Sequence, residues 1–377
     1  MRVVASGVVF DTGSAPVNER SASSSAALAL ADGTILASFR LGTERESGDG
    51  HAALFASRDL GATWELRYLG LADRTLNGIP GETRGMNLAE LKPGEITAST
   101  LWTDRSVPSR PWVNQQTQGL LPMLNYHTVS HDGGHTWSAP RVVDLAPHPS
   151  ASTTGPVLRL AGDALGQPFE HWKLYDDPAV GRPRAMLRIS PDAGRTWPDD
   201  VVVAADPANR TYYWDQRLAT HPASGEIVAM FWTFDREANA DLPIHIAWGS
   251  PDGRHWTVPT ATTLDGQHCQ PVAIGGERLV AVYSHRRNPP GVRAALSHDF
   301  GRTWDPTDEV EVYGSRAGDE PSATGAASEL EYWNAMGAWQ FGHPRAVPLP
   351  HGEVFVVFYA GEGATRSACW ARVTIDE

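Results

Sequence analysis

The stretch Ser130-His131-Asp132-Gly133-Gly134-His135-Thr136-Trp137 decides the fold, because close copies of it recur along the chain. Full copies begin at Ser57, Ser190 and Ser297, and a copy shortened by one residue begins at Ser250. The shared pattern is S-x-D-x-G-x-T-W. An internal repeat of this kind indicates an architecture built from several copies of one structural unit.

Each copy of the motif is suited to a tight turn with an apolar anchor. The aspartate can accept hydrogen bonds from nearby backbone N–H groups, and the glycine can adopt a positive φ. The tryptophan gives each unit a large apolar surface. Since each copy supplies a single carboxylate, we interpret the motif as structural rather than metal-binding.

A second periodic signal is a glycine that precedes an apolar stretch rich in β-formers. The clearest stretches are residues 35–39, 227–232 and 354–359, and these follow Gly33, Gly225 and Gly352. Such stretches predict hairpins with a glycine in the turn. Together the two signals predict six units of four strands each, and no long amphipathic helix interrupts them.

Composition excludes several classes of protein. The formal net charge is −13 and no run of Lys and Arg occurs, so we expect neither nucleic acid nor an anionic membrane as a partner. No apolar run reaches 18 residues and no secretion signal is evident, so we expect a cytoplasmic protein without a transmembrane helix. The two cysteines, Cys269 and Cys369, do not form a disulfide framework, although they could pair.

The repeats resemble the Asp-boxes, or BNR repeats, of the sialidase (neuraminidase) superfamily, and the resemblance covers essentially the whole chain. It implies an all-β fold, a six-bladed β-propeller that forms one domain over residues 1–377. It also implies a divergent glycoside hydrolase that removes a terminal, acidic sugar from an oligosaccharide or glycoconjugate without a cofactor. Fold alone does not fix the chemistry.

The resemblance assigns roles to three residues on the propeller face that carries the longer connections. Arg20, before the first strand of its unit, matches an arginine that binds the substrate carboxylate. Asp49 matches the general acid, and Glu46 and His51 are close enough in sequence to compete for that role. Asp215, at the start of the fourth unit, matches a glutamate that activates the nucleophile, and we expect it to be catalytic.

The fifth unit is similar to its sialidase counterpart over a longer stretch. His268 and Gln270 begin its first strand, and His285 ends the second. Arg293 falls at the position of another carboxylate-binding arginine. We therefore expect these four residues to bind substrate.

The sixth unit departs from the superfamily pattern. Residues 339–344 contain no tyrosine at the place of the sialidase nucleophile, and His343 lies there instead. Histidine can act as acid, base or ligand near neutral pH, so we expect a catalytic role for His343. Tyr213, in the fourth unit, is a candidate for substrate contact. No H-x-H or H-x₃-H pair occurs among the histidines expected on this face, so we expect no metal.

Two other functions remain open at this point. A lyase acting on a uronate-ended oligosaccharide by β-elimination would suit the histidines and the missing tyrosine. A non-catalytic propeller that binds glycan or protein would suit the aromatic residues of the connections, among them Trp102, Trp112, Trp172 and Trp339. An unsaturated product would identify the lyase, and binding without turnover would identify the binding protein.

Overall fold

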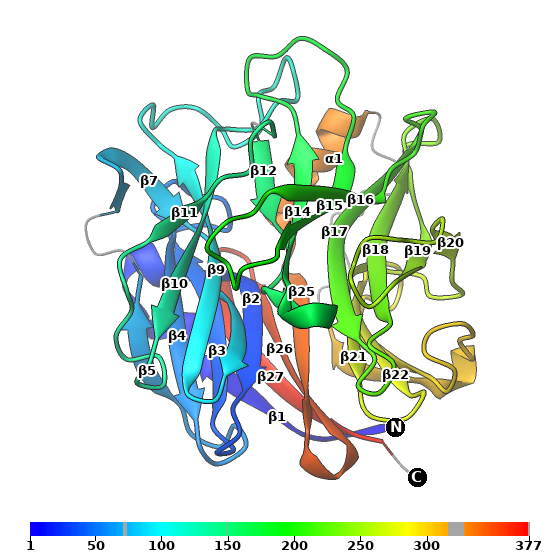
Figure 1. Ribbon diagram of the computed structural model, residues 1–377. Coiled ribbons are helices and arrows are strands. Elements are labelled where there is room, and N and C mark those ends of the chain that lie inside the picture. Colours follow the sequence, from blue (N-terminus) through cyan, green and yellow to red (C-terminus); the bar gives the residue numbers. More distant parts are fainter. Residues whose placement is uncertain (71–73, 149, 316–327, 376–377) are drawn as a thin grey trace.

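The computed structural model describes residues 1–70, 74–148, 150–315 and 328–375, and antiparallel sheets make up most of it (Figure 1). The sheets are arranged around a central axis like the blades of a propeller. Among these residues there is one α-helix, α1 (Glu329–Ala335). The 3₁₀-helices are η1 (Thr12–Ser14), η2 (Val17–Glu19), η3 (Ala161–Asp163), η4 (Pro306–Asp308), η5 (Met336–Ala338) and η6 (Pro350–Gly352). The expected all-β class is therefore confirmed.

The largest sheet joins both ends of the chain. Its strands, in spatial order, are β25 (Phe341–Leu349), β26 (Glu353–Glu362), β27 (Thr365–Thr374), β2 (Ser21–Ala29), β3 (Ile35–Gly42), β4 (His51–Ser57) and β5 (Glu65–Leu69). The first strand, β1 (Arg2–Phe10), pairs antiparallel with β27. One parallel pair, Ser21 with Arg366, links β2 to β27. Strand β1 thus fastens the beginning of the chain to its last three strands.

Four smaller sheets complete the described structure. The second sheet contains β6 (Thr75–Leu76), β7 (Ile79–Thr83), β8 (Asn87–Lys92), β9 (Glu95–Asp104), β10 (Met123–Ser130) and β11 (Arg141–Val143). The third contains β12 (Ser150–Thr153), β13 (Leu158–Arg159), β14 (Leu165–Trp172), β15 (Arg184–Ser190) and β16 (Asp199–Ala204). The fourth contains β17 (Thr211–Thr220), β18 (Ile227–Asp235), β19 (Ala240–Gly249) and β20 (Thr260–Ala261), and the fifth contains β21 (Gln267–Ala273), β22 (Leu279–His285), β23 (Gly291–Ser297) and β24 (Glu309–Gly314).

The core lies between neighbouring sheets. Every residue of β18 and β22 is buried, because the second strand of a unit is covered on both faces. Such strands read as continuous apolar runs rather than alternating patterns. Val280 and Val282 of β22, for example, belong to one apolar cluster with Val354 and Val356 of β26. Apolar packing of this kind holds neighbouring sheets together around the axis.

The repeated motif forms the tight turn that its residues predict. The Ser130 hydroxyl donates to Asp132 Oδ1 at 2.8 Å, and the same oxygen accepts the Thr136 N–H at 2.9 Å. The Trp137 indole N–H donates to the Gly134 carbonyl at 3.1 Å, and Gly134 adopts φ 93. The same bonds recur in the copies that begin at Ser57 and Ser297.

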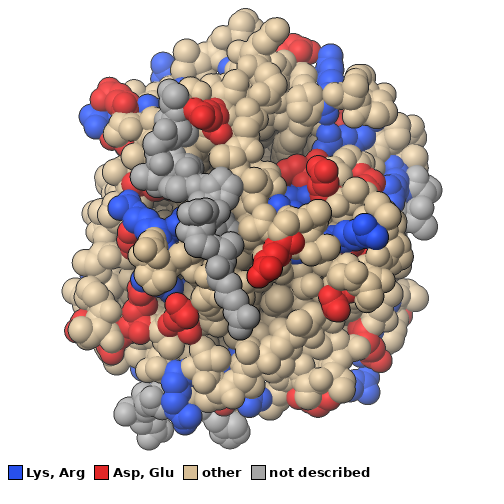
Figure 2. All heavy atoms as spheres, turned by 180° about the vertical axis from the view of Figure 1, so that it is seen from behind, with Lys and Arg blue, Asp and Glu red and all other residues tan. Residues whose placement is uncertain are grey.

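Three further features of the described structure are its surface charges, its cysteines and its helices. On the face shown in Figure 2, basic and acidic side chains are interspersed. Cys269 and Cys369 are both free thiols, which answers the question that the sequence left open. Among the described helices, none combines the length and the apolar character that a bilayer span requires.

Candidate functional site

Three ionisable side chains meet at the axis because the strands that carry them are bulged. The pairing register shifts between Trp214 and Arg217 in β17, between Gln267 and Gln270 in β21, and between Gly342 and Arg345 in β25. A bulge bends the strand and re-aims a side chain. The residues within these bulges are Asp215, His268 and His343, with φ values of 49, 40 and 53.

A fourth bulge, in β2, places Ser24 in the equivalent conformation with φ 49. Positive φ is uncommon for residues other than glycine, and it costs about 1–3 kcal/mol where the surrounding structure imposes it. Four such residues at equivalent places in four innermost strands indicate a site rather than local irregularity.

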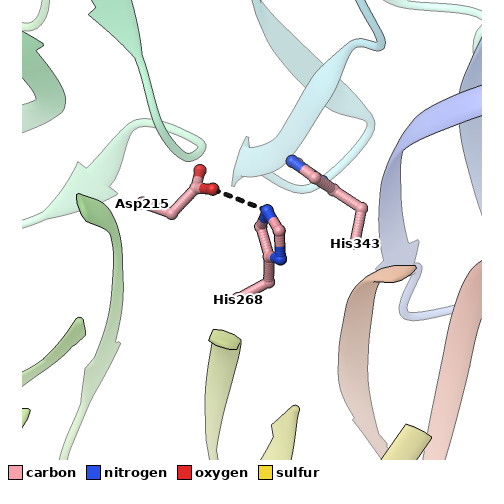
Figure 3. A group of neighbouring side chains, drawn as sticks. All are labelled: Asp215, His268 and His343. Atoms are coloured by element: carbon pink, nitrogen blue, oxygen red, sulfur yellow. Dashed lines mark ion pairs between the residues drawn. The ribbon is translucent and has the colours of Figure 1, made fainter. Parts of the chain in front are cut away.

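The three ionisable side chains point toward one another (Figure 3). Asp215 Oδ2 lies 2.9 Å from His268 Nε2, and Asp215 Oδ1 accepts from Arg217 Nη2 at 2.9 Å. Burial opposes ionisation of Asp215, but Arg217 and His268 outweigh it and hold the pKa of this carboxyl well below its usual value. Burial also lowers the pKa of His268 to about 4, even though Asp215 favours its charged form. Asp215 is therefore a carboxylate at neutral pH.

Glu170, on β14, is the second carboxyl group of the site. Its Oε1 accepts the backbone N–H of Gln216, the residue after Asp215, at 3.3 Å. Burial and the negative charge of Asp215 raise the pKa of Glu170 to about 8, although Arg217 acts in the opposite direction. At neutral pH the two carboxyl groups consequently differ, with Glu170 protonated and Asp215 ionised.

Both carboxyl groups line a cavity of about 400 Å³. This size falls within the range of small-molecule sites, roughly 300–1,000 Å³. Five tryptophans contribute to its wall, and they are Trp112, Trp172, Trp214, Trp232 and Trp333. Flat aromatic surfaces with a few ionisable groups between them suit a ligand that has both apolar faces and hydroxyl groups.

A cluster of charged residues lines another part of the cavity. Glu46 Oε1 lies 2.8 Å from Arg45 Nη1, and its Oε2 lies 2.7 Å from Arg84 Nη2. Burial opposes its ionisation, but Arg84 and Arg45 lower the pKa of Glu46 to about 2. The Arg84 guanidinium lies 4.1 Å from the Trp112 ring centroid, which is a cation–π contact.

Of the catalytic and substrate-binding residues expected from the sequence, Asp215, His268, His343 and Tyr213 line this cavity, as does Glu46, the competitor of Asp49. Gln270 does not line it but accepts from Arg345, which does, at 3.0 Å.

Asp49, the general acid that the resemblance implies, lies in the connection between β3 and β4. It is not among the cavity-lining residues, and it accepts from the Thr43 N–H at 3.1 Å, the Thr43 hydroxyl at 2.5 Å and the Ser47 hydroxyl. Burial raises its pKa, but these bonds prevail and lower it. Asp49 thus shapes the connection after β3, and Glu46 of the same connection is the carboxylate that lines the cavity.

Arg20, His285 and Arg293 also lie outside the cavity lining. The Arg20 side chain is exposed, and the bulged residue of the strand that follows it, β2, is Ser24. His285 is buried with Nδ1 at 2.8 Å from the Asp265 carbonyl. Arg293 forms an ion pair with Glu309 at 2.7 Å.

Sequence reasoning missed Glu170, Arg217 and Arg345. The two arginines each follow a bulged residue by two positions, in Asp-Gln-Arg within β17 and His-Pro-Arg within β25. That spacing was a usable signal. Glu170 had no such signal, because it lies on β14, the second strand of its sheet, and not on an innermost strand.

The donor atoms of Asp215, His268 and His343 lie within 4.8 Å of one another, and such a group could hold a metal ion by ligand type. However, Arg217 already donates to the same carboxylate, and the buried Arg345 lies two residues after His343. Positive charge around the group opposes a cation. We therefore assign no metal to it.

No protein-family model matches this chain, and no curated protein matches it. Solved structures do resemble it. A protein of unknown function from Dyadobacter fermentans gives a TM-score of 0.73 at 20% identity, with 100% of this chain and 99% of that chain covered. The Hadza microbial sialidase Hz136 gives 0.68 at 14% identity, covering 98% and 68%, and the α-L-arabinanase of Penicillium chrysogenum gives 0.64 at 13% identity, covering 99% of both. The chain therefore has the propeller-like fold of sialidases and an arabinanase.

Proposed function

We propose that this protein is a glycoside hydrolase that removes a terminal sugar, with Glu170 and Asp215 as its catalytic residues. The observation that carries the proposal is the pair of carboxyl groups that line one cavity in opposite protonation states. Pairs of carboxyl groups with pKa values driven apart by their surroundings supply the acid and the base of glycoside hydrolysis. The fold neighbours that are glycosidases support the same class.

Glu170 acts as the general acid in this proposal. Its proton passes to the glycosidic oxygen as the bond to the anomeric carbon breaks, which leaves a neutral hydroxyl on the departing sugar. Asp215 either activates a water molecule or attacks the anomeric carbon. The separation of the two carboxyl groups across the bound sugar selects between inversion and retention.

Arg217 and His268 are positioning residues for Asp215. Both contact its oxygens at 2.9 Å, and both favour the carboxylate over the acid. His343 stands where sialidases have a tyrosine nucleophile, and its pKa is held well below its usual value by burial. An imidazole that stays neutral in this way is suited to accept a hydrogen bond from a sugar hydroxyl.

We also propose that the fold is a six-bladed propeller in one domain over residues 1–377. The eight-stranded sheet consists of β25, β26, β27 and β1 on one side and β2, β3, β4 and β5 on the other. The single parallel pair between Ser21 and Arg366 joins the halves. Division at this pair turns five sheets into six units, which match the six hairpin units of the sequence.

The test is a panel of sialyl, uronyl, arabinosyl and neutral oligosaccharides, with products identified by mass and by ultraviolet absorbance. Glu170→Gln and Asp215→Asn are expected to lose turnover, and Asp49→Asn is the matched control outside the cavity. A saturated released sugar supports the proposal. An unsaturated uronate would replace hydrolysis with β-elimination, and binding without turnover of any glycan would contradict an enzymatic function.

A further inference from the structure

Two arginine side chains lie side by side at the base of the cavity. Arg217 Nη1 and Arg345 Nη2 both donate to the Thr154 carbonyl oxygen, at 2.5 Å and 2.8 Å. Both arginines line the cavity, and their exposed fractions are 2% and 6%. Like charges so close together are costly in a buried place unless negative charge balances them.

Only one of the two guanidinium groups has a carboxylate partner. Arg217 pairs with Asp215, whereas no ion pair of Arg345 occurs among the described residues. Arg345 donates instead to neutral acceptors, Gln270 Oε1 at 3.0 Å and Asn87 Oδ1 at 3.0 Å, besides the Thr154 carbonyl. Burial and the neighbouring Arg217 hold the pKa of Arg345 well below its usual value. Because Glu170 is protonated at neutral pH, Asp215 is the one negative charge beside Arg217 and Arg345, and the base of the cavity thus has one positive charge in excess.

Unused hydrogen-bonding groups accompany this excess charge. Arg345 Nε, Thr154 Oγ1 and His343 Nδ1 are buried polar atoms without a hydrogen-bond partner. Thr154 and His343 line the cavity together with Arg345. Buried polar groups are nearly always paired, so unpaired ones beside an unbalanced charge point to a missing ligand.

We propose that the base of the cavity binds one negative charge, either the carboxylate of a bound sugar or a small free anion such as a halide or formate. Arg345 supplies the charge, and its Nε–H and the Thr154 hydroxyl are the donors left for the anion. The carboxylate source rests on the proposed glycosidase function, whereas the free-anion source does not. A carboxylate at this point would define the substrate as an acidic sugar, a class that includes both uronic and sialic acids.

The first experiment is isothermal titration calorimetry of the full chain with sodium formate, sodium bromide, sodium glucuronate and glucose. Ionic strength is kept constant with the salt of a bulky sulfonate buffer. Saturable binding of anions by the wild type is expected, and Arg345→Met should weaken it by at least about tenfold. Arg210→Met, which removes an arginine that pairs with Asp235 outside the cavity, is the matched control and should leave the affinity unchanged.

The ligands distinguish the two sources of negative charge. Glucuronate that binds at least about tenfold more tightly than both formate and glucose identifies the sugar carboxylate. Equal affinities for formate, bromide and glucuronate identify a free-anion site. Calorimetry needs no turnover. If the protein binds anions but cleaves no glycan, the proposed glycosidase function is contradicted and the proposed anion site is not.

Three results would overturn the inference. These are the absence of saturable anion binding, unchanged binding in a folded Arg345→Met variant, and binding of Co²⁺ with ligand-field absorbance, which requires the opposite charge balance. If Arg345→Met does not fold, crystals of the wild type soaked in bromide decide the matter. An anomalous peak within hydrogen-bonding distance of Arg345 Nε supports the site, and a cavity without a peak refutes it.

Discussion

The pKa of Glu170 can be tested without any substrate, through the pH dependence of folding stability. The protein carries this carboxyl group with a pKa of about 8, against an ordinary value of 4.5. Below pH 4.5 the group is protonated in the folded and in the unfolded chain, so it contributes no pH dependence. Between 4.5 and about 8 the unfolded chain loses this proton and the folded chain keeps it. Stability therefore decreases as pH rises through this window and levels off above it.

The expected size follows from the shift. One pH unit inside the window corresponds to about 1.4 kcal/mol for one proton. From about pH 5 to about pH 7.5 the Glu170 contribution to the free energy of unfolding should fall by about 3 kcal/mol. Glu170→Gln replaces the carboxyl by a neutral amide of nearly the same shape, and its carbonyl oxygen can still accept the Gln216 N–H. The variant should lack this part of the pH dependence.

The assay is urea unfolding of the wild type and of Glu170→Gln at several pH values in one buffer system. The difference between the two free energies of unfolding removes the contributions of all other titrating groups. The difference should change steadily with pH, and the variant should be the more stable protein near pH 8. Parallel curves would show that Glu170 titrates like an ordinary carboxyl, and they would remove it as the general acid.

Three further predictions concern chemistry and folding. On a substrate found by the panel, Glu170→Gln should reduce kcat about 10²–10⁴-fold, the usual contribution of a general acid, while Asp49→Asn should keep kcat within about tenfold. Arg217→Met removes a group that keeps Asp215 ionised, so the acidic limb of the kcat/KM profile should move to higher pH. Gly301→Ala should lower the free energy of unfolding by about 1–3 kcal/mol, measured by urea unfolding, because the positive φ at this turn disfavours a residue with a Cβ and that Cβ would crowd the Ile246 side chain.

Each of these predictions has a result that would contradict it or a control variant. A larger loss of kcat in Asp49→Asn than in Glu170→Gln would restore Asp49 as the acid, and an unmoved acidic limb in Arg217→Met would show that Asp215 does not titrate in the profile. At Gly301, φ is 86 and a Cβ would lie 2.6 Å from Ile246 Cδ1. Gly337 has no atom within 4 Å of such a Cβ, so Gly337→Ala should leave stability unchanged.

The repeats were sufficient to predict the all-β class and the hairpin units. Each copy of S-x-D-x-G-x-T-W folds through bonds among its own residues, as Asp132 and Thr136 show. Local bonding of this kind can be recognised in sequence because its residues are neighbours along the chain. The continuous apolar run of residues 227–232 likewise predicted a strand, and every residue of β18 is buried in the structure.

Part of the candidate site could also be located from the sequence, because its residues occupy similar places in the repeated unit. Asp215, His268 and His343 lie on three innermost strands, and the repeat predicts that side chains near the starts of these strands approach the axis. Their bulges were not predictable, since a bulge depends on pairing with the neighbouring strand. The Asp-Gln-Arg and His-Pro-Arg spacing shows that two arginines follow these residues, but not that they share one carbonyl oxygen.

By itself, then, the sequence determined the strands, the turns and the places in the repeat where reactive side chains occur, because each of these depends on residues close together in the chain. Only the tertiary structure decided which carboxyl groups line the cavity. Glu170 owes its raised pKa to burial and to Asp215, which approaches it from another sheet. Asp49, despite its place in the sequence, is held by Thr43 and Ser47. Protonation states and charge balance arise from contacts between distant segments, and these exist only after the sheets have closed around the axis.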